Sequence, residues 1–357
     1  METKKKGFPA AFWVCACTEI FERLAYYLGR SLILIFVTAS VATGGLGLSD
    51  TVAANMQSNL TAFSYLLPLF GAVIVDKYIG ARYTTPVGMF IAAAGYFTGG
   101  IAKSSAGVYA MIFLVSLGLA LFKNGAIIGR VITDKSQMDP AFSMRYTLVN
   151  VGAFIGTFLV GILYKDVFAK DGVLGFAPCF KMAALMMVLG GLWYIFVCWR
   201  FLGDLGKLPF KKTLTEEEKA AEAKKKEEKG TKQPLTTIEK KRIGAIFVAS
   251  LFSIVFWIFW YLGYMPVYFY WAENMDWVVA GYQVPSTWFD AANSLFCVIL
   301  GPVTAALWKK LAARPQGDMS LFRKTGLGIA IIGVGYLFYA AIDIMRGGEK
   351  ASVLWLI

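Results

Sequence analysis

Long apolar stretches recur along this chain of 357 residues, and they limit its fold more than any other feature. Each has about 20 residues, which is enough for a helix to cross a hydrocarbon core about 30 Å thick. Inside lipid the backbone must satisfy its own hydrogen bonds, so a spanning segment is a helix or part of a closed barrel. The stretches lack the alternating pattern of barrel strands. We therefore predict an all-α polytopic membrane protein.

The apolar stretches are interrupted by one long charged segment. We expect an N-terminal six-helix bundle over 1–202, a charged cytoplasmic linker over 203–241 and an incomplete C-terminal helix bundle over 242–357. Six helices on each side of such a linker are typical of secondary transporters built from related halves, so the second half is expected to be truncated. The expected spans are 11–39, 52–75, 84–102, 108–132, 146–164, 176–198, 243–271, 288–311 and 321–344, with a tenth beginning at Ala351.

Charge and composition limit the partners, metal sites and proton carriers that this chain can have. The formal charge is +12, but the excess cations lie in loops and the linker, which favours membrane topology over a nucleic-acid partner. Lys4, Lys5, Lys6 and Arg145 are among the cations counted on the inner side, which predicts a cytoplasmic N-terminus. The chain has no histidine, and its five cysteines lack metal-ligand spacing. We expect no cofactor, and protons, if they are the coupling ion, must be carried by carboxylates.

The first span contains an unusual charged stripe. At about 100° per residue, four of its residues lie within roughly 60° of one another, flanked by two more. A charge near the bilayer centre costs on the order of 3 kcal/mol, so these side chains are expected to face a cavity or one another. A structural ion pair between Glu19 and Arg23 is the simplest reading, but it leaves the others unexplained. The stripe residues are Glu19, Arg23, Tyr26 and Arg30, and the flanking residues are Glu22 and Tyr27.

Polar residues also occur inside later spans. Lys123 in the fourth span needs an anion, which could be a glutamate of the first span or the carboxylate of a substrate. In the fifth span Tyr146 and Asn150 lie one turn apart, while Gly152 and Gly156 predict close contact with another helix.

Three stretches in order resemble the proton-coupled oligopeptide transporter (POT) family of the major facilitator superfamily. Glu19, Glu22, Arg23, Tyr26 and Tyr27 match its Glu-x-x-Glu-Arg-Phe-x-Tyr-Tyr motif, with Leu24 in place of Phe. The segment 142–152 resembles Phe-x-x-x-Tyr-x-x-x-Asn-x-Gly, and 284–302 resembles the eighth span, with Asp290 where Gln is usual. The loop 71–82 is similar to the superfamily's signature loop, in which Asp76 and Arg82 would brace the cytoplasmic gate.

The resemblance implies two bundles of six helices and symport of di- and tripeptides with protons by alternating access. Glu19, Glu22 and Arg23 would couple proton movement to the cycle. Arg30 and Lys123 would meet the peptide carboxylate, and the remaining residues would line the cavity and hold the peptide backbone. These lining residues are Tyr26, Tyr27, Tyr65, Asn150 and Asn293.

The chain departs from the family pattern in three places. The seventh span carries no acid around 259–263, so Arg30 would lose its usual partner. No proline follows Lys123, and a tenth-span glutamate would lie beyond Ile357. Transport of another anion such as nitrate therefore stays open, as does a non-transporting nutrient receptor. An intramembrane enzyme is disfavoured because no serine nucleophile motif or aspartate pair is evident.

Overall fold

The computed structural model describes residues 7–134, 137–210, 236–263, 266–312, 314–315 and 319–356. Within these residues the chain is mostly helical, as the apolar stretches predict. It divides into two compact units, each described by itself below. The first is Met1–Thr213 with Thr287–Ile299, and the second is Leu214–Ser286 with Leu300–Ile357.

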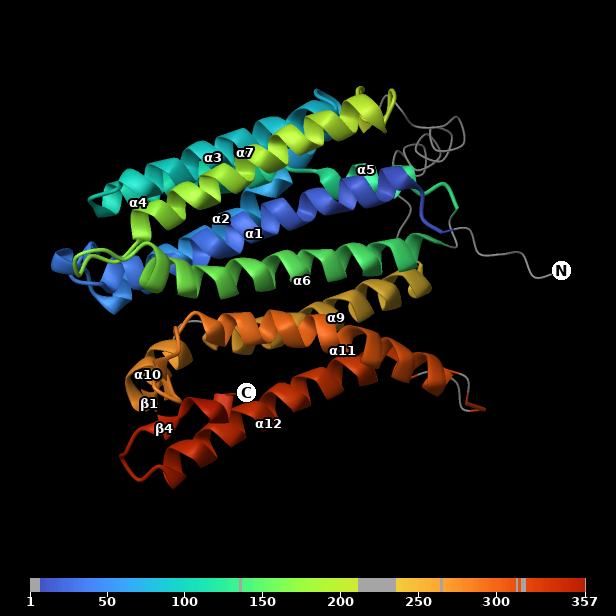
Figure 1. The fold of residues 1–357 in the computed structure, drawn as a ribbon. Coiled ribbons are helices and arrows are strands. Elements are labelled where there is room, and N and C mark those ends of the chain that lie inside the picture. The colour runs from blue at the N-terminus through green and yellow to red at the C-terminus, as the bar shows by residue number, and fades with distance from the viewer. Residues whose placement is uncertain are drawn as a thin grey trace. The chain divides into compact units, whose positions relative to one another are not determined.

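The first unit is built from long helices that lie side by side (Figure 1). Most of them match an apolar stretch of the sequence, and Phe12, Tyr194 and Cys198 are among the residues of the core. The elements are α1 (Ala10–Thr38), the 3₁₀ helix η1 (Val41–Thr43), α2 (Asp50–Lys77), α3 (Ala81–Ile101), α4 (Ser105–Leu121), α5 (Asn124–Val131), α6 (Met138–Ile162), the π-helical η3 (Leu163–Val167) and α7 (Phe176–Arg200).

Helix α1 packs against α6 and α7, while α3 packs against α4 and α7. The contact between α1 and α6 depends on glycine. A Cβ atom at Gly152 would lie 2.8 Å from the Ile20 carbonyl oxygen, and one at Gly156 would lie 2.5 Å from that of Leu24. Both distances are too short for a side chain, so the prediction of close helix contact at these two glycines is confirmed.

The fourth span is interrupted, although its sequence predicts one helix over 108–132. Helix α4 ends at Leu121 and α5 begins at Asn124. The Lys123 backbone has φ −124° and ψ 35°, which is not helical. Its N–H donates to the Thr85 hydroxyl of α3 at 3.3 Å, so a neighbouring helix satisfies a backbone group that the break exposes. The break forms without the proline that would have signalled it.

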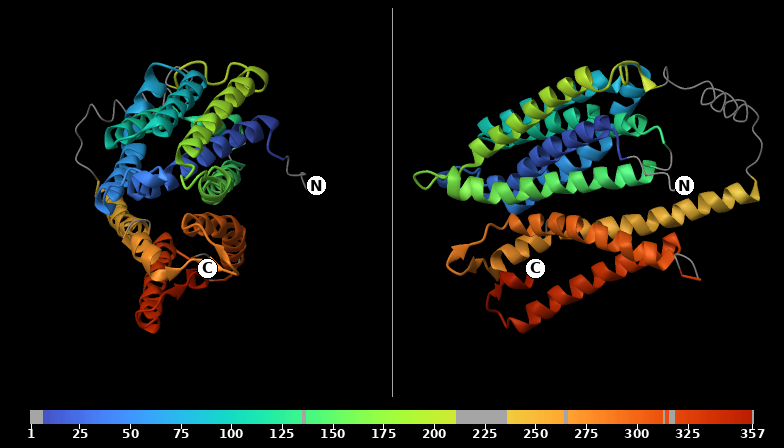
Figure 2. Two further views of the ribbon diagram at one scale, coloured as in Figure 1. Left: turned by 60° about the vertical axis from the view of Figure 1, so that its left-hand side comes forward. Right: turned by 45° about the vertical axis from the view of Figure 1, so that its right-hand side comes forward.

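The second unit contains α9 (Thr237–Leu262), α10 (Pro266–Asn274) and α12 (Leu321–Met345), with α12 beside α9 (Figure 2). Thr236 and Glu239 form a reciprocal capping box at the start of α9. Helix α11 (Trp288–Ala312) contributes its first turns to the first unit and the rest to the second. The expected seventh span, 243–271, lies within α9 and α10, which together make up one candidate membrane span, Thr237–Asn274.

Short strands complete the second unit. Strand β1 (Met275–Asp276) pairs in parallel with β4 (Ala351–Ser352), and β2 (Val278–Val279) pairs in antiparallel fashion with β3 (Tyr282–Gln283). The 3₁₀ helix η5 (Val353–Leu356) follows β4. A membrane-spanning helix was expected to start at Ala351. Over 351–356 the structure instead has the strand β4 followed by η5.

Six helices are long and apolar enough to cross a membrane, counted over the described residues. They are Asp50–Lys77, Ser105–Val131, Pro140–Val167, Phe176–Arg200, Thr237–Asn274 and Phe322–Met345. Helix α1 has the length of a span but carries the charged stripe. Most of the expected charged linker over 203–241, namely 211–235, lies outside the described residues.

Candidate proton and substrate site

The charged stripe of α1 lies in the interior of the first unit. Glu19 is 1% exposed, Glu22 is fully buried and Arg30 is 6% exposed. Charged side chains are seldom buried without partners, because desolvation of a lone charge is very costly. The contacts of these side chains therefore define the site.

Glu22 and Arg23 form an ion pair within α1. The Arg23 guanidinium donates to both carboxylate oxygens of Glu22, with Nη2 at 2.8 Å from Oε1 and Nε on Oε2. The Glu19–Arg23 pair that the helical spacing allows is not the one observed, because Arg23 pairs with Glu22. Adjacent residues do not face one another on a helix, so the long Arg23 side chain must curl back to reach its neighbour. Glu19 is already engaged by other helices.

Glu19 bonds to two side chains that the sequence interpretation did not assign to the site. Arg145 Nε of α6 donates to Glu19 Oε1 at 2.8 Å, and Asn124 Nδ2 of α5 donates to the same oxygen at 3.1 Å. Arg145 was counted as a loop cation, but α6 begins at Met138 and includes it. The positions of residues around the helix could have indicated that Arg145 faces α1. Arg145, Gly152 and Gly156 lie within about 40° of one another, so the face that approaches α1 carries the arginine.

A tyrosine ring lies beside each arginine of the stripe. The Arg23 guanidinium carbon lies 5.1 Å from the centre of the Tyr26 ring, and that of Arg30 lies 5.8 Å from the Tyr27 ring. The two rings are perpendicular, with centroids 5.4 Å apart. Cations favour the faces of aromatic rings, so the two tyrosines help to stabilise the half-buried Arg23 and the buried Arg30.

Tyr96 of α3 is a further buried member of the site. It is 1% exposed, its hydroxyl has no hydrogen-bond partner among the described residues, and it interacts electrostatically with Tyr26, Glu22 and Arg23. Its ring contacts Gly29 so closely that no Cβ could be accommodated there. Tyr96 could not be predicted from the sequence, because nothing in α3 relates a lone tyrosine to the glutamates of α1.

Asp290 is an acid that interacts with Arg30, for which the seventh span supplies no acidic partner. It lies in the first turn of α11, and its buried Oδ1 has no hydrogen-bond partner in the part of the chain that the structure describes. Arg30 and Tyr27 both interact electrostatically with it. The Trp288 indole stacks on Phe158 of α6 and donates to its carbonyl oxygen at 3.1 Å, which fixes this turn in the first unit. Arg30 therefore lies near an acid that a different helix supplies.

Lys123 lies at the break between α4 and α5 and is half-buried. Its ammonium donates to the Pro68 carbonyl oxygen of α2 at 3.0 Å, and Asp76 interacts with it electrostatically. Of the two anions that the sequence left open, a first-span glutamate is not its partner, because both glutamates bond to arginines. A substrate carboxylate remains as the other candidate.

The remaining predicted lining residues are more dispersed. Asn150 donates to the Tyr146 carbonyl oxygen of its own helix at 2.9 Å. Tyr65 of α2 is 67% exposed in the first unit, and Asn293 of α11 is half-buried. Their role as lining residues stays a prediction.

The predicted gate residue Arg82 binds the segment that follows α7. Its guanidinium donates to the carbonyl oxygens of Cys198, at 2.6 Å, and of Gly203, and its N–H donates to Gly206 at 3.1 Å. A cation at the C-terminal end of a helix is favourable because the last carbonyls carry partial negative charge. Nearby, the Lys207 ammonium bonds to Asp204 at 2.6 Å and lowers the pKa of that carboxyl group.

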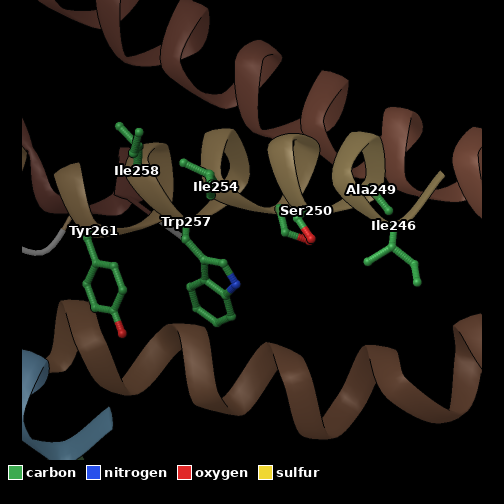
Figure 3. Close-up of a pocket in the computed structure, with 8 residues that line it drawn as sticks. Ile246, Ala249, Ser250, Ile254, Trp257, Ile258 and Tyr261 are labelled. Carbon is green, nitrogen blue, oxygen red and sulfur yellow. The ribbon is translucent and has the colours of Figure 1, made fainter. Parts of the chain in front are cut away.

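A groove of about 740 Å³ runs along α9 in the second unit (Figure 3). Trp257 and Tyr261 point in the same direction from the helix, and the wall is largely aliphatic and aromatic. Its lining contains none of the predicted site residues. The lining residues are Ile246, Ala249, Ser250, Ser253, Ile254, Trp257, Ile258 and Tyr261.

Comparison with known proteins agrees with this architecture. A family model described as the POT family matches residues 204–357. A protein of Bacillus subtilis named as an uncharacterized transporter, YclF, is 24% identical over 98% of this chain and 77% of its own length. A di-/tripeptide transporter of Lactococcus lactis is 23% identical over 98% of this chain and 79% of its own length.

Solved structures show the same fold. A mutant of the peptide transporter POT in complex with alafosfalin has a TM-score of 0.83 and 24% identity, over 99% of this chain and 79% of that one. A POT family transporter in complex with 5-aminolevulinic acid also has a TM-score of 0.83, with 22% identity, over 99% of this chain and 80% of that one.

Proposed function

We propose that this chain is a transporter of the POT family, whose family model matches residues 204–357, and that it carries di- and tripeptides across a membrane together with protons. The observation that carries the proposal is the pair of buried glutamates on α1, each bonded to an arginine. A buried carboxylate next to a cation can be neutral or charged according to whether that cation stays close. Such a group can exchange a proton as helices move.

Glu22 is the carboxylate best suited to this exchange. Protonation would remove its charge and release the Arg23 guanidinium, which lies against Tyr26. A released cation changes which contacts α1 can make, so proton binding and helix movement would be linked. In alternating access, two halves rock about a central site, and this link would make the movement depend on the proton gradient.

Arg30 and Lys123 supply positive charge for the carboxylate of a peptide. Arg30 can bind it through two parallel hydrogen bonds, whereas Lys123 acts as a point charge. Tyrosine hydroxyls and amides such as Asn150 suit a peptide backbone whose side chains vary. This division would allow one site to accept many sequences.

Uptake into proteoliposomes under an inward proton gradient tests the proposal. We expect a labelled dipeptide to accumulate, and a protonophore that collapses the gradient to stop the accumulation. Glu22→Gln should abolish gradient-driven accumulation but retain exchange of labelled for unlabelled peptide across the membrane. The matched control is Glu273→Gln, which changes an exposed glutamate of α10 and should behave like the native chain.

Accumulation that persists after the gradient collapses, or in Glu22→Gln, would contradict proton coupling at Glu22. Competition identifies the cargo. The buried Arg30 and the half-buried Lys123 also suit a small inorganic anion, so inhibition by nitrate and not by unlabelled dipeptides would favour anion transport on the same fold. Binding without any flux would favour a receptor.

A further inference from the structure

The two glutamates of α1 are held in different ways. Glu22 bonds to its neighbour on the same helix, so the pair can move with α1. Glu19 bonds to α5 and α6. The charged and titratable groups that interact with Glu19 are Cys15, Glu22 and Arg23 of α1 and Arg145 of α6, and Tyr96 of α3 interacts with Glu22.

The clamp on Glu19 is tightly packed. One carboxylate oxygen accepts from both Arg145 Nε, at 2.8 Å, and Asn124 Nδ2, at 3.1 Å. Asn124 is fully buried and also donates to the Cys15 carbonyl oxygen at 2.8 Å. The Arg145 guanidinium lies against α5, where a Cβ at Gly125 would be 3.1 Å from its central carbon. Separation of α1 from α6 would move Glu19 away from its cation.

The glycine contacts oppose such separation. Gly152 and Gly156 bring the α6 backbone against α1 about two and three turns farther along the face that bears Arg145. The ion pair and the glycine contacts lie on the same side of α6, within about 40°. Helices α1 and α6 thus form one packed element at this site.

We propose that Arg145 is a positioning residue for proton coupling, because it keeps Glu19 ionised throughout the transport cycle and leaves Glu22 as the exchangeable carboxylate of α1. This inference rests on the proposed function. It adds that the two glutamates of the motif have different roles, which the motif alone does not distinguish. Substrate binding and proton exchange then occur beside a fixed negative charge.

A simpler account is that the Glu19–Arg145 pair only stabilises the contact between α1 and α6. The two accounts differ in the protonation of Glu19 when Arg145 is neutral. A buried carboxylate that loses its cation takes up a proton, since the isolated charge cannot be supported. Infrared absorbance of protonated carboxyl groups, followed as the pH of the purified full-length protein is changed, reports this directly and without transport.

The variants are Arg145→Gln, the double variant Glu19→Gln/Arg145→Gln, and Arg242→Gln as a control at an exposed arginine of α9. We expect Arg145→Gln to gain a protonated-carboxyl signal at neutral pH that the double variant and the control lack. In transport, Arg145→Gln should shift the pH of half-maximal uptake by one unit or more, which is a tenfold change in proton concentration, and the double variant should reverse the shift.

Glu19→Gln and Glu22→Gln in the native background keep the test decisive if Arg145→Gln does not fold. We expect Glu22→Gln to remove a titrating carboxyl signal and Glu19→Gln to leave that signal unchanged. Loss of a titrating signal in Glu19→Gln, or no new signal in Arg145→Gln, would overturn the inference. Because the spectrum does not require transport, failure of the proposed function would be seen separately, as absent uptake by the native chain.

Discussion

The proposed binding of a peptide carboxylate by Lys123 can be tested with a single substitution. Lys123 is half-buried at the break between α4 and α5, and its ammonium bonds to a backbone carbonyl oxygen. A hydrogen bond to a charged group contributes about 1.5–3 kcal/mol. We expect Lys123→Gln to weaken the binding of dipeptides by roughly 10- to 150-fold, a factor of ten for each 1.4 kcal/mol.

Competition between a dipeptide and its C-terminal amide checks this prediction. The native chain should prefer the free carboxylate, and Lys123→Gln should lose most of that preference. Lys103→Gln changes an exposed lysine in the loop after α3 and should keep it. An unchanged preference in Lys123→Gln would remove Lys123 from the carboxylate site.

Side-chain pairing was the part of the site that the sequence predicted least well. The spacing of Glu19 and Arg23 predicts a pair within α1, but Glu19 instead bonds to Arg145, 126 positions along the chain. Local spacing identifies which residues share a helix face, and it cannot identify a partner that another helix supplies. The burial of the stripe followed from the cost of charge in lipid and did not need the partner.

At the scale of helices, the contact between α1 and α6 is the most sensitive packing feature. Gly156→Ala would place a Cβ 2.5 Å from the Leu24 carbonyl oxygen, so the helices must move apart. Overpacking of this kind costs about 1–3 kcal/mol. We expect a lower melting temperature in detergent, measured by tryptophan fluorescence.

Gly333→Ala in α12 is the control, because a Cβ there meets nothing within 4 Å in the structure. It should leave the melting temperature unchanged or raise it slightly, since alanine favours helix more than glycine does. Equal melting temperatures for Gly156→Ala and the native chain would contradict the packing argument.

The positions of most helices were predictable because an apolar stretch of about 20 residues has few alternatives in a membrane protein. The break at Lys123 was not, because the proline that would mark it is absent and the Thr85 hydroxyl that satisfies the exposed N–H lies on another helix. The strand at Ala351 was also missed, since its pairing with Met275 depends on tertiary contacts.

The orientation of the chain in the membrane can be tested by labelling residues exposed on each side. The excess of Lys and Arg in loops on the side of the N-terminus predicts that this side is cytoplasmic. We expect a membrane-impermeant maleimide to label Lys170→Cys in intact cells and to label Lys207→Cys only after permeabilisation. Both lysines are exposed, so a difference in labelling reports the side of the membrane.

The native chain gives the background for this measurement, since Cys15, Cys179 and Cys198 are buried and Cys17 and Cys297 are half-buried. Labelling of Lys207→Cys in intact cells would reverse the predicted orientation.

The contacts of Arg82 determine where the chain can be cut into two fragments that still assemble. By binding the carbonyl groups of Cys198, Gly203 and Gly206, Arg82 fastens the chain beyond the end of α7 to the start of α3. A chain expressed as two fragments cut after residue 202 would deprive Arg82 of two of these acceptors. A cut within 211–235 would leave them in the N-terminal fragment, so complementation by separately expressed halves should succeed with the second cut and fail with the first.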